Sequence, residues 1–313
     1  MALCLVTGGA GFIGSHTVDA LLDRGDHVRV LDNFSSGHRD NLVDVQDRID
    51  IIEGDIRDKA TVQKAVKDVE LIFHLAAMAS VPKSMKDPLA AEAINARGTL
   101  DLLVAAQKAG ARRLIFSSTC AVYGDDPTLP KIEIQRPIPK SPYAVAKLAA
   151  EGYCQVFNES FGLETAILRY FNVYGPRQDP SSPYSGVISI FVDKMSRGQS
   201  PTIFGTGEQT RDFVYVSDVV QANLLAGNVP GAVGRIFNIG RGQQISINQL
   251  FQHLNDLLQT NIKAINAPAR NGDIQHSCTD PSQASQVLGW QTQVSFEQGL
   301  RRLLTAIQVK SSR

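Results

Sequence analysis

Short apolar runs separated by longer segments of helical period dominate the first half of the chain. Each run is apolar almost throughout, rather than at every second position, which is typical of parallel strands covered by helices on both faces. The pattern predicts an α/β fold with a doubly wound parallel sheet. The predicted strands are Leu3–Thr7, Val28–Asp32, Ile49–Glu53, Leu71–Leu75, Arg113–Ser117 and Thr165–Tyr170.

The pattern changes after about Phe171, where loops become longer and rich in Pro, Gly and Ser; such loops often carry specificity. Further strands are predicted at Thr202–Phe204 and Ile236–Ile239, and helices at Ser189–Arg197, Val216–Ala226, Ile247–Leu258 and Pro281–Leu288. We predict a Rossmann-type domain over residues 1–171, to which the chain returns at roughly 212–240. A second, smaller α/β substrate-binding domain is predicted over residues 172–211 and 241–313.

Composition narrows the classes of partner. A hydrophobic content of 43% over 313 residues is enough to bury a large core. Lys and Arg together number 31, as do Asp and Glu, and no basic block is long. We therefore expect a small ligand, and neither a nucleic acid nor a membrane surface, as the partner.

Cysteine and histidine usage points to a cytoplasmic protein without a bound metal. The four cysteines lack the spacing of a disulfide framework and are interpreted as free thiols in a reducing compartment. The six histidines are scattered without the spacing of metal ligands, so no metal site is predicted. No signal peptide precedes the first strand and no apolar run could span a bilayer, which predicts a soluble protein.

A glycine-rich turn follows the first predicted strand. Gly8, Gly11 and Gly14 have the spacing GxxGxxG, between that strand and a predicted helix. The first glycine permits a tight turn, the second lets the backbone approach a pyrophosphate, and the third allows close packing of helix on strand. The context predicts a dinucleotide site; the alternative is that the glycines serve turns only.

Asp32 ends the next predicted strand, where a carboxylate can accept hydrogen bonds from the adenosine ribose. An acid there disfavours the 2′-phosphate of NADP, and neighbouring Asn33 and Phe34 bring no arginine to offset it, so NAD is the predicted cofactor. The alternative for Asp32 is a strand-end cap. Ligands in such sheets lie at the carboxyl ends of strands, so the ends of the third and fourth strands should line the same site. These residues are Asp55, Ile56, Leu75, Ala76 and Ala77.

A hydroxyl-rich strand end and a Tyr-Lys pair form the candidate catalytic set. Ser141 and Pro142 suit the start of a helix, on which Tyr143 and Lys147 share one face. A base that removes a hydroxyl proton during hydride transfer must titrate near neutrality, about three pH units below free tyrosine. A lysine ammonium and a positive nicotinamide ring can supply much of that shift. Thr119, at the end of the strand, would hydrogen-bond the same oxygen; the alternative is an exposed Tyr-Lys pair without a catalytic role.

These motifs, in this order, resemble those of the extended short-chain dehydrogenase/reductases, and among them the UDP-sugar 4-epimerases. The resemblance covers nearly all 313 residues. It is carried by the segments 7–14, 32–33, 54–57, 74–77, 117–119, 168–175 and 211–213, together with Tyr143 and Lys147. Many of these epimerases carry serine where Thr119 stands; threonine keeps the hydroxyl and so the role.

The resemblance implies roles for residues that spacing alone does not assign. On the cofactor side, it implies Phe12, Ile13, Asn95, Ser117 and Tyr170, with Ser117 near the nicotinamide. On the substrate side, it implies that Asn172 grips the substrate, that Arg211 and Arg270 hold the diphosphate and that Asp273 binds the uridine ribose. Guanidinium groups suit phosphate oxygens, although either arginine taken alone is more often a solvated surface charge.

The run after Thr119 favours one reaction within this resemblance. Similar 4,6-dehydratases carry an Asp-Glu pair there, and UDP-glucuronate decarboxylases carry a glutamate before Val-Tyr-Gly, whereas this chain has Cys120 and Ala121. Reversible inversion of carbon 4 through a 4-keto intermediate with tightly bound NAD is therefore predicted. A UDP-glucuronate 4-epimerase, a decarboxylase, a dehydratase, and a non-catalytic NAD- or sugar-nucleotide-binding regulator remain alternatives.

The resemblance also suggests the sugar and the assembly. Ser277 falls where glucose-restricted epimerases place a tyrosine, which leaves room for an N-acetyl group and predicts UDP-GlcNAc/UDP-GalNAc as well as UDP-Glc/UDP-Gal. The alternative is a plain loop serine. The helical stretches Ala96–Ala109 and Tyr143–Ser160 correspond to helices that pair into a four-helix bundle in similar enzymes, so a homodimer is predicted. The alternative is that these two helices only pack on the sheet and do not form a dimer interface.

Overall fold

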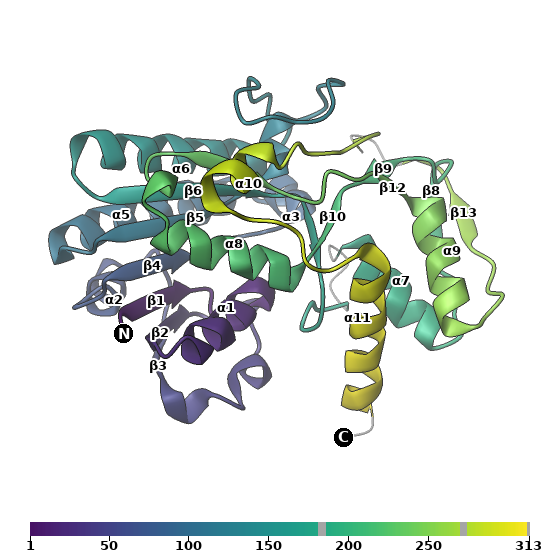
Figure 1. The fold of residues 1–313 in the computed structure, drawn as a ribbon, viewed down its shortest axis with the longest axis horizontal. Coiled ribbons are helices and arrows are strands. Elements are labelled where there is room, and N and C mark those ends of the chain that lie inside the picture. Colours follow the sequence, from purple (N-terminus) through teal and green to yellow (C-terminus); the bar gives the residue numbers. More distant parts are fainter. Residues whose placement is uncertain (181–185, 270–273, 312–313) are drawn as a thin grey trace.

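The computed structural model describes residues 1–180, 186–269 and 274–311. A seven-stranded sheet, parallel throughout, forms the larger lobe, with strand order β11-β6-β5-β4-β1-β2-β3 (Figure 1). This order confirms the doubly wound sheet predicted from the apolar runs. The strands are β1 (Leu3–Thr7), β2 (His27–Asp32), β3 (Ile49–Glu53), β4 (Leu71–His74), β5 (Arg113–Thr119), β6 (Glu164–Tyr170) and β11 (Ile236–Ile239).

Helices cover both faces of the sheet, which is why its strands are apolar on both sides. One face packs on α1 (Phe12–Asp23), α8 (Val216–Asn228) and α10 (Ser282–Leu288), whose buried residues share one core with the strands. The other face packs on α2 (Lys59–Ala65), α5 (Gly98–Ala109) and α6 (Pro142–Ser160) around a second core. The carboxyl ends of the strands are left to the loops, where the site lies.

A smaller lobe is built from three two-stranded sheets and three helices, at the right of Figure 1. The strand pairs are β7 (Asn172–Tyr174) with β10 (Phe213–Tyr215), β9 (Thr210–Arg211) with β12 (Ile245–Ser246), and β8 (Thr202–Phe204) with β13 (Ile265–Ala267). The helices α7 (Val187–Ser196), α9 (Ile247–Leu258) and α11 (Phe296–Ser311) close a third core over them. The predicted domain boundaries at 171, 211 and 240 stay predictions.

The long apolar runs were placed well from the sequence, and most of the short elements of the smaller lobe were not. The predictions for β1, β3, β8, β11 and α9 agree with the structure residue for residue, whereas β5 runs two residues further than predicted and β4 ends one earlier. The pattern did not indicate α3 (Val81–Lys86), α4 (Pro88–Glu92), α11 or the short strands of the smaller lobe other than β8. Strands of two or three residues are too short to show a period.

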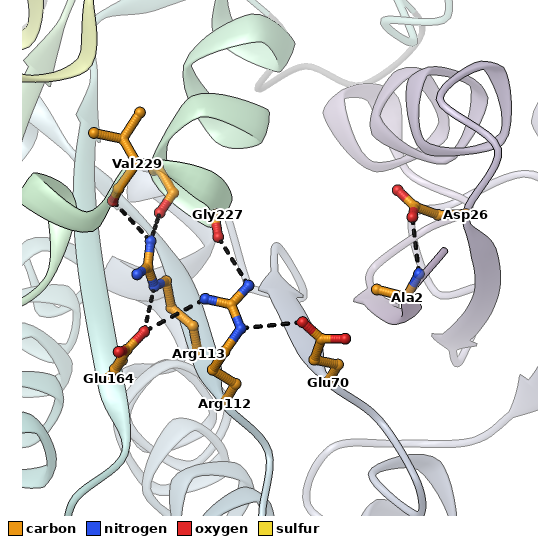
Figure 2. A network of polar contacts seen from close by, with 9 residues as sticks. Ala2, Asp26, Glu70, Arg112, Arg113, Glu164, Gly227 and Val229 are labelled. Atoms are coloured by element: carbon orange, nitrogen blue, oxygen red, sulfur yellow. Dashed lines mark hydrogen bonds and ion pairs between the residues drawn. The ribbon is translucent and has the colours of Figure 1, made fainter.

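Two arginines hold the C-terminal end of α8 at the amino-terminal ends of β5 and β6 (Figure 2). The Arg113 guanidinium donates from Nη1 to the carbonyls of Ala226 and Val229, both at 2.9 Å, and from Nε to Glu164 at 2.8 Å. Arg112 donates to a further carbonyl of the same helix end. Carbonyls that a helix C-terminus leaves without partners are satisfied in this way, so the returning chain is anchored to the sheet.

The four cysteines are free thiols, as expected. Within the described part of the chain, no helix is long and apolar enough to cross a membrane.

Candidate active site

The glycine turn between β1 and α1 lies against the loop that follows β4. A Cβ on Gly14 would lie 2.0 Å from the Gly8 carbonyl oxygen, so the helix can start this close to the turn only with glycine there. Gly8 has a φ of +71°, and a Cβ on it would lie 2.7 Å from the backbone nitrogen of Ala76. Phe12 and Ile13 form the first turn of α1 directly after Gly11. The result is a cradle of bare backbone at a helix N-terminus, which fits a pyrophosphate.

Asp32 joins this turn to the loop that follows β2. Its buried carboxylate accepts the Ala10 amide at 2.9 Å and the Phe34 amide at 2.8 Å, and burial raises its pKa. Asn33 donates to Asp55 across the ends of β2 and β3, at 2.8 Å. The hydrogen bonds from Arg57 hold the pKa of Asp55 well below its usual range. The predicted adenosine residues therefore lie together at one end of the sheet.

Asn95 fixes the loop after β4, which contains Leu75, Ala76 and Ala77. Its side chain accepts the Met78 amide at 2.8 Å and donates to the Met78 carbonyl at 3.2 Å. Both ends of the Asn95 side-chain amide are therefore hydrogen-bonded to the backbone of this loop. Asn95 belongs to a π-helical turn, Ala93–Arg97, directly before α5. Such turns are frequent at functional sites, and the sequence carries no signature for this one.

A hydrogen-bonded chain through buried His74 supports the same loop, a role that the sequence did not indicate. The imidazole contacts the Thr7 hydroxyl through Nδ1 at 2.7 Å and the Thr99 hydroxyl through Nε2 at 2.9 Å. Because Thr99 donates to the Asn95 carbonyl, Nε2 carries the ring proton. Burial lowers the pKa of His74 to about 3. The neutral ring thus orients Thr7, whose hydroxyl accepts the Ala76 amide at 3.2 Å.

The candidate catalytic residues meet where β5 ends and α6 begins. The Ser141 hydroxyl accepts the Ala144 amide at 3.2 Å, and Pro142 occupies the first turn, as predicted for the start of this helix. Tyr143 shares a side-chain hydrogen bond with Thr119. Buried Lys147 donates from Nζ to the Ser117 carbonyl at 2.7 Å. The set is therefore assembled by one strand end and two turns of one helix.

Burial dominates the electrostatics of the Tyr143–Lys147 pair. Although the Tyr143 ring is partly exposed, burial around its hydroxyl raises its pKa to about 12, against the hydrogen bond with Thr119, which lowers it. Burial lowers the pKa of Lys147 to about 8. Burial therefore moves the phenol away from neutrality. The Lys147 ammonium and the positive nicotinamide ring, the two sources of acidity that we predicted, would have to outweigh this burial.

Ser117 and Tyr170 lie together beside this centre and are anchored by α8. They share a side-chain hydrogen bond, and the Tyr170 hydroxyl donates to Asn223 at 2.5 Å. Asn223 in turn contacts the Thr17 hydroxyl of α1 at 3.4 Å. Sequence reasoning missed Asn223, because a single amide in a helix carries no pattern of its own.

A cavity of about 160 Å³ lies in the smaller lobe and brings together two of the predicted substrate residues. Asn172 and Arg211 line it, with apolar walls that sequence reasoning did not assign to a site. The Arg211 guanidinium donates to the carbonyls of Thr210 and Ile274 at 2.8 and 2.7 Å. The remaining lining residues are Val187, Phe191, Thr202, Phe204, Gln209 and Ile247.

The other predicted substrate residues are less completely described. Ser277 is buried near this lobe, whereas Arg270 and Asp273 lie outside the described residues. A larger cavity of about 380 Å³ lies beside Arg112 and Glu164, at the amino-terminal ends of the strands and away from the predicted site residues.

Asp212 ties three segments of the chain together next to Arg211. Its fully buried carboxylate accepts the amides of Arg241, Gly242 and Thr279 at 2.7, 2.9 and 3.0 Å. Burial raises its pKa to about 6. We identified the Arg-Asp-Phe motif from the sequence, but the role of its acid became visible only with these long-range partners.

The fold and this set of residues define a class of enzyme. The chain matches the model of the NAD dependent epimerase/dehydratase family over residues 4–240, and it belongs to this family of extended short-chain dehydrogenase/reductases. Its cofactor is NAD. Within the described residues, no group of three or more His, Cys, Asp or Glu side chains could hold a metal ion.

Several similar proteins are named as UDP-sugar 4-epimerases, and one as a decarboxylase. A putative UDP-glucose 4-epimerase of Methanocaldococcus jannaschii is 42% identical over 96% of this chain and 97% of its own. The UDP-glucose 4-epimerase of Thermotoga maritima, solved with UDP-glucose, is 41% identical with a TM-score of 0.95, over 99% of both chains. The UDP-N-acetylglucosamine 4-epimerase of Methanobrevibacter ruminantium, solved with UDP-N-acetylmuramic acid, is 40% identical with a TM-score of 0.94, also over 99% of both chains. A UDP-N-acetyl-glucosaminuronate decarboxylase of Bacillus cytotoxicus is 34% identical over 96% of both chains.

Proposed function

We propose that this protein is a UDP-hexose 4-epimerase. The observation that carries the proposal is the composition of the reaction centre. Tyr143 is hydrogen-bonded to Thr119, at the end of β5. The turn that follows Thr119, Cys120–Tyr123, contains no acid. A centre with one proton acceptor suits oxidation and reduction at one carbon, whereas elimination of water needs a further acid or base.

Each residue of the set has a defined part in this proposal. Tyr143 takes the proton from the hydroxyl on carbon 4 and returns it in the second half of the reaction. Thr119, already hydrogen-bonded to Tyr143, holds the same oxygen in place. Lys147 contributes a positive charge from a buried position beneath the strand end. When bound at the glycine turn and Asp32, NAD would supply a reversible hydride acceptor for carbon 4.

For the sugar, we propose both plain and N-acetylated hexoses. Ser277 is the small residue that supports an acetylated substrate, and two of the most similar solved structures bear the names of UDP-glucose and UDP-N-acetylglucosamine 4-epimerases. Ser277→Tyr should therefore reduce kcat/KM for UDP-GlcNAc more than for UDP-glucose. Equal loss on both substrates would remove Ser277 from the specificity argument.

The proposal is tested by incubating the purified NAD-loaded enzyme with UDP-glucose and UDP-GlcNAc separately and resolving the C4 epimers by chromatography. Formation of UDP-galactose or UDP-GalNAc, without net consumption of NAD, is expected. Absence of an epimer from every UDP-hexose would refute the proposal. Release of carbon dioxide from UDP-glucuronate, or a 4-keto-6-deoxy product, would assign the protein to the decarboxylase or dehydratase branch instead.

We further propose a homodimer formed through the outer faces of α5 and α6, which lie side by side in Figure 1. Val145, Tyr153 and Val156 of α6 and Val104 of α5 are all exposed, as apolar side chains at a surface covered by a second subunit would be in one chain alone. Val156→Glu should give a monomer in size-exclusion chromatography with light scattering. Val43→Glu, at an exposed valine outside these helices, is the matched control and should not change the mass.

A further inference from the structure

A buried ion pair joins the three elements that carry the candidate active site, and it has no part in the chemistry proposed above. Glu151 lies on α6 and Arg169 on β6, with side chains 2% and 3% exposed. Arg169 donates to the two carboxylate oxygens of Glu151 from Nε at 2.9 Å and from Nη2 at 2.7 Å. The third partner is the Ser118 hydroxyl of β5, which also donates to Glu151.

The position of this cluster relates it to both sides of the reaction centre. Tyr143, Lys147 and Glu151 recur every four residues and therefore share one face of α6. Ser118 stands between Ser117, whose carbonyl accepts Lys147, and Thr119, which hydrogen-bonds Tyr143. A movement at Glu151 would therefore change the register of the catalytic helix against the catalytic strand.

The remaining contacts of Arg169 extend the cluster to the loop between β5 and α6. Its Nη1 donates to the Tyr123 hydroxyl at 2.9 Å and to the Glu133 carbonyl at 3.3 Å, and its guanidinium lies 4.8 Å from the Tyr123 ring. Tyr123 in turn donates to Asn238 of β11 at 2.7 Å. The Nη1 group of Arg169 thus has two protein partners. Together with the two hydrogen bonds to Glu151, they fix the orientation of the guanidinium.

Stability alone is a weak reason to keep such a pair. Removing two ions from water is costly, and apolar residues of similar volume often replace a buried ion pair without loss of stability. What apolar residues cannot replace is the directional contact among three elements and the negative charge. Both the contacts and the charge bear on Lys147.

The charge of Glu151 acts on Lys147. Three titratable side chains interact electrostatically with Lys147: Cys154 and Glu151 on α6, and His74 on β4. Burial raises the pKa of the Cys154 thiol and lowers the pKa of His74 to about 3, so both are uncharged near neutrality. Burial lowers the pKa of Lys147 to about 8, and the Glu151 carboxylate opposes this shift.

We propose that Glu151 is a positioning residue for the catalytic set. Bound to Arg169 and Ser118, it keeps α6 in register with the end of β5, and its negative charge keeps the Lys147 ammonium protonated. The proposal rests on the proposed epimerase activity only for its kinetic readout.

The decisive variant is Glu151→Gln, which keeps the shape of the side chain and removes its charge. The NAD-loaded enzyme is labelled with carbon-13 at the lysine Cε, and the signal of Lys147 is assigned by its loss in Lys147→Arg. In Glu151→Gln the titration midpoint of Lys147 should fall by about one pH unit. With an active wild type, kcat should fall about tenfold while KM for the UDP-hexose changes little.

Glu164→Gln is the matched control, because Glu164 also pairs with an arginine, Arg113. That pair lies at the amino-terminal ends of β5 and β6, away from the catalytic residues (Figure 2). It should leave the Lys147 midpoint, kcat and KM unchanged. An unchanged midpoint in Glu151→Gln overturns the proposal, whatever happens to its Tm.

If Glu151→Gln does not fold, the double variant Glu151→Leu/Arg169→Met removes both charges and fills the space. Its Tm should stay close to that of the wild type, while the Lys147 midpoint should still fall, though by less than in Glu151→Gln, because the positive charge of Arg169 is removed as well. A normal midpoint in the folded double variant overturns the proposal. If the wild type yields no epimer, the proposed function fails, and the titration still decides the role of Glu151.

Discussion

Buried Asp212 should contribute a stability that rises as the solution becomes more acidic, over a defined window. Burial raises its folded-state pKa to about 6 from an ordinary value of 3.8. A carboxyl with a raised folded pKa binds its proton more tightly in the folded state than in the unfolded state. Its contribution is therefore fully present below pH 3.8 and is lost as the pH rises through about 6. Between pH 7.5 and pH 5, linkage gives a gain of about 1 kcal/mol in the free energy of unfolding.

Asp212→Asn isolates this contribution, because an amide does not titrate. The amide keeps one acceptor for the three amides that Asp212 binds, so the variant should be less stable at both pH values, by about 2 kcal/mol at pH 5. Urea unfolding at saturating NAD, followed by circular dichroism at pH 5 and pH 7.5, measures both proteins. The difference in stability between them should be about 1 kcal/mol larger at pH 5 than at pH 7.5. A difference that is the same at the two pH values would refute the linkage argument.

Three further predictions concern the site itself. Tyr143→Phe should lower kcat at least about a hundredfold with little change in NAD content, because it removes the proposed proton acceptor; turnover close to wild type would show another group to be the base. Gly14→Ala places a Cβ 2.0 Å from the Gly8 carbonyl oxygen and should yield protein that loses NAD on gel filtration, measured by the absorbance of released dinucleotide; full retention would contradict the close-packing argument. Because the pKa of Lys147 is lowered to about 8, kcat should decline as the pH rises through that value, and Lys147→Arg, which stays charged, should lack this decline.

Features that depend on local sequence were predicted well. The strands of the large sheet are buried on both faces, so their apolar runs mark them directly, and the glycine turn follows from three residues within seven positions. Thr119, Tyr143 and Lys147 could be grouped because a strand end and a helix start each carry a local signature. The structure then brought these two segments together.

Features that depend on long-range contacts could not be predicted. Asn223 reaches Tyr170 from a helix more than fifty residues away, and Asp212 binds amides that follow much later in the chain. Glu151 and Arg169 are charged residues inside apolar segments, and only the packing of α6 on the sheet shows that they pair. The burial that raises the pKa of Tyr143 also depends on this packing, which the local spacing to Lys147 does not report.

The position of β11 has a consequence for the order in which this chain can fold during synthesis. This strand lies at one edge of the large sheet, beside β6, although the chain passes through part of the smaller lobe between the two. Until residue 239 has left the ribosome, β6 presents an unpaired edge whose side chains from Thr165 onward are apolar or destined for burial. Such an edge can pair with another nascent chain. A fragment ending near residue 171 should therefore aggregate, and translation pauses between residues 171 and 239 should lower the yield of soluble enzyme.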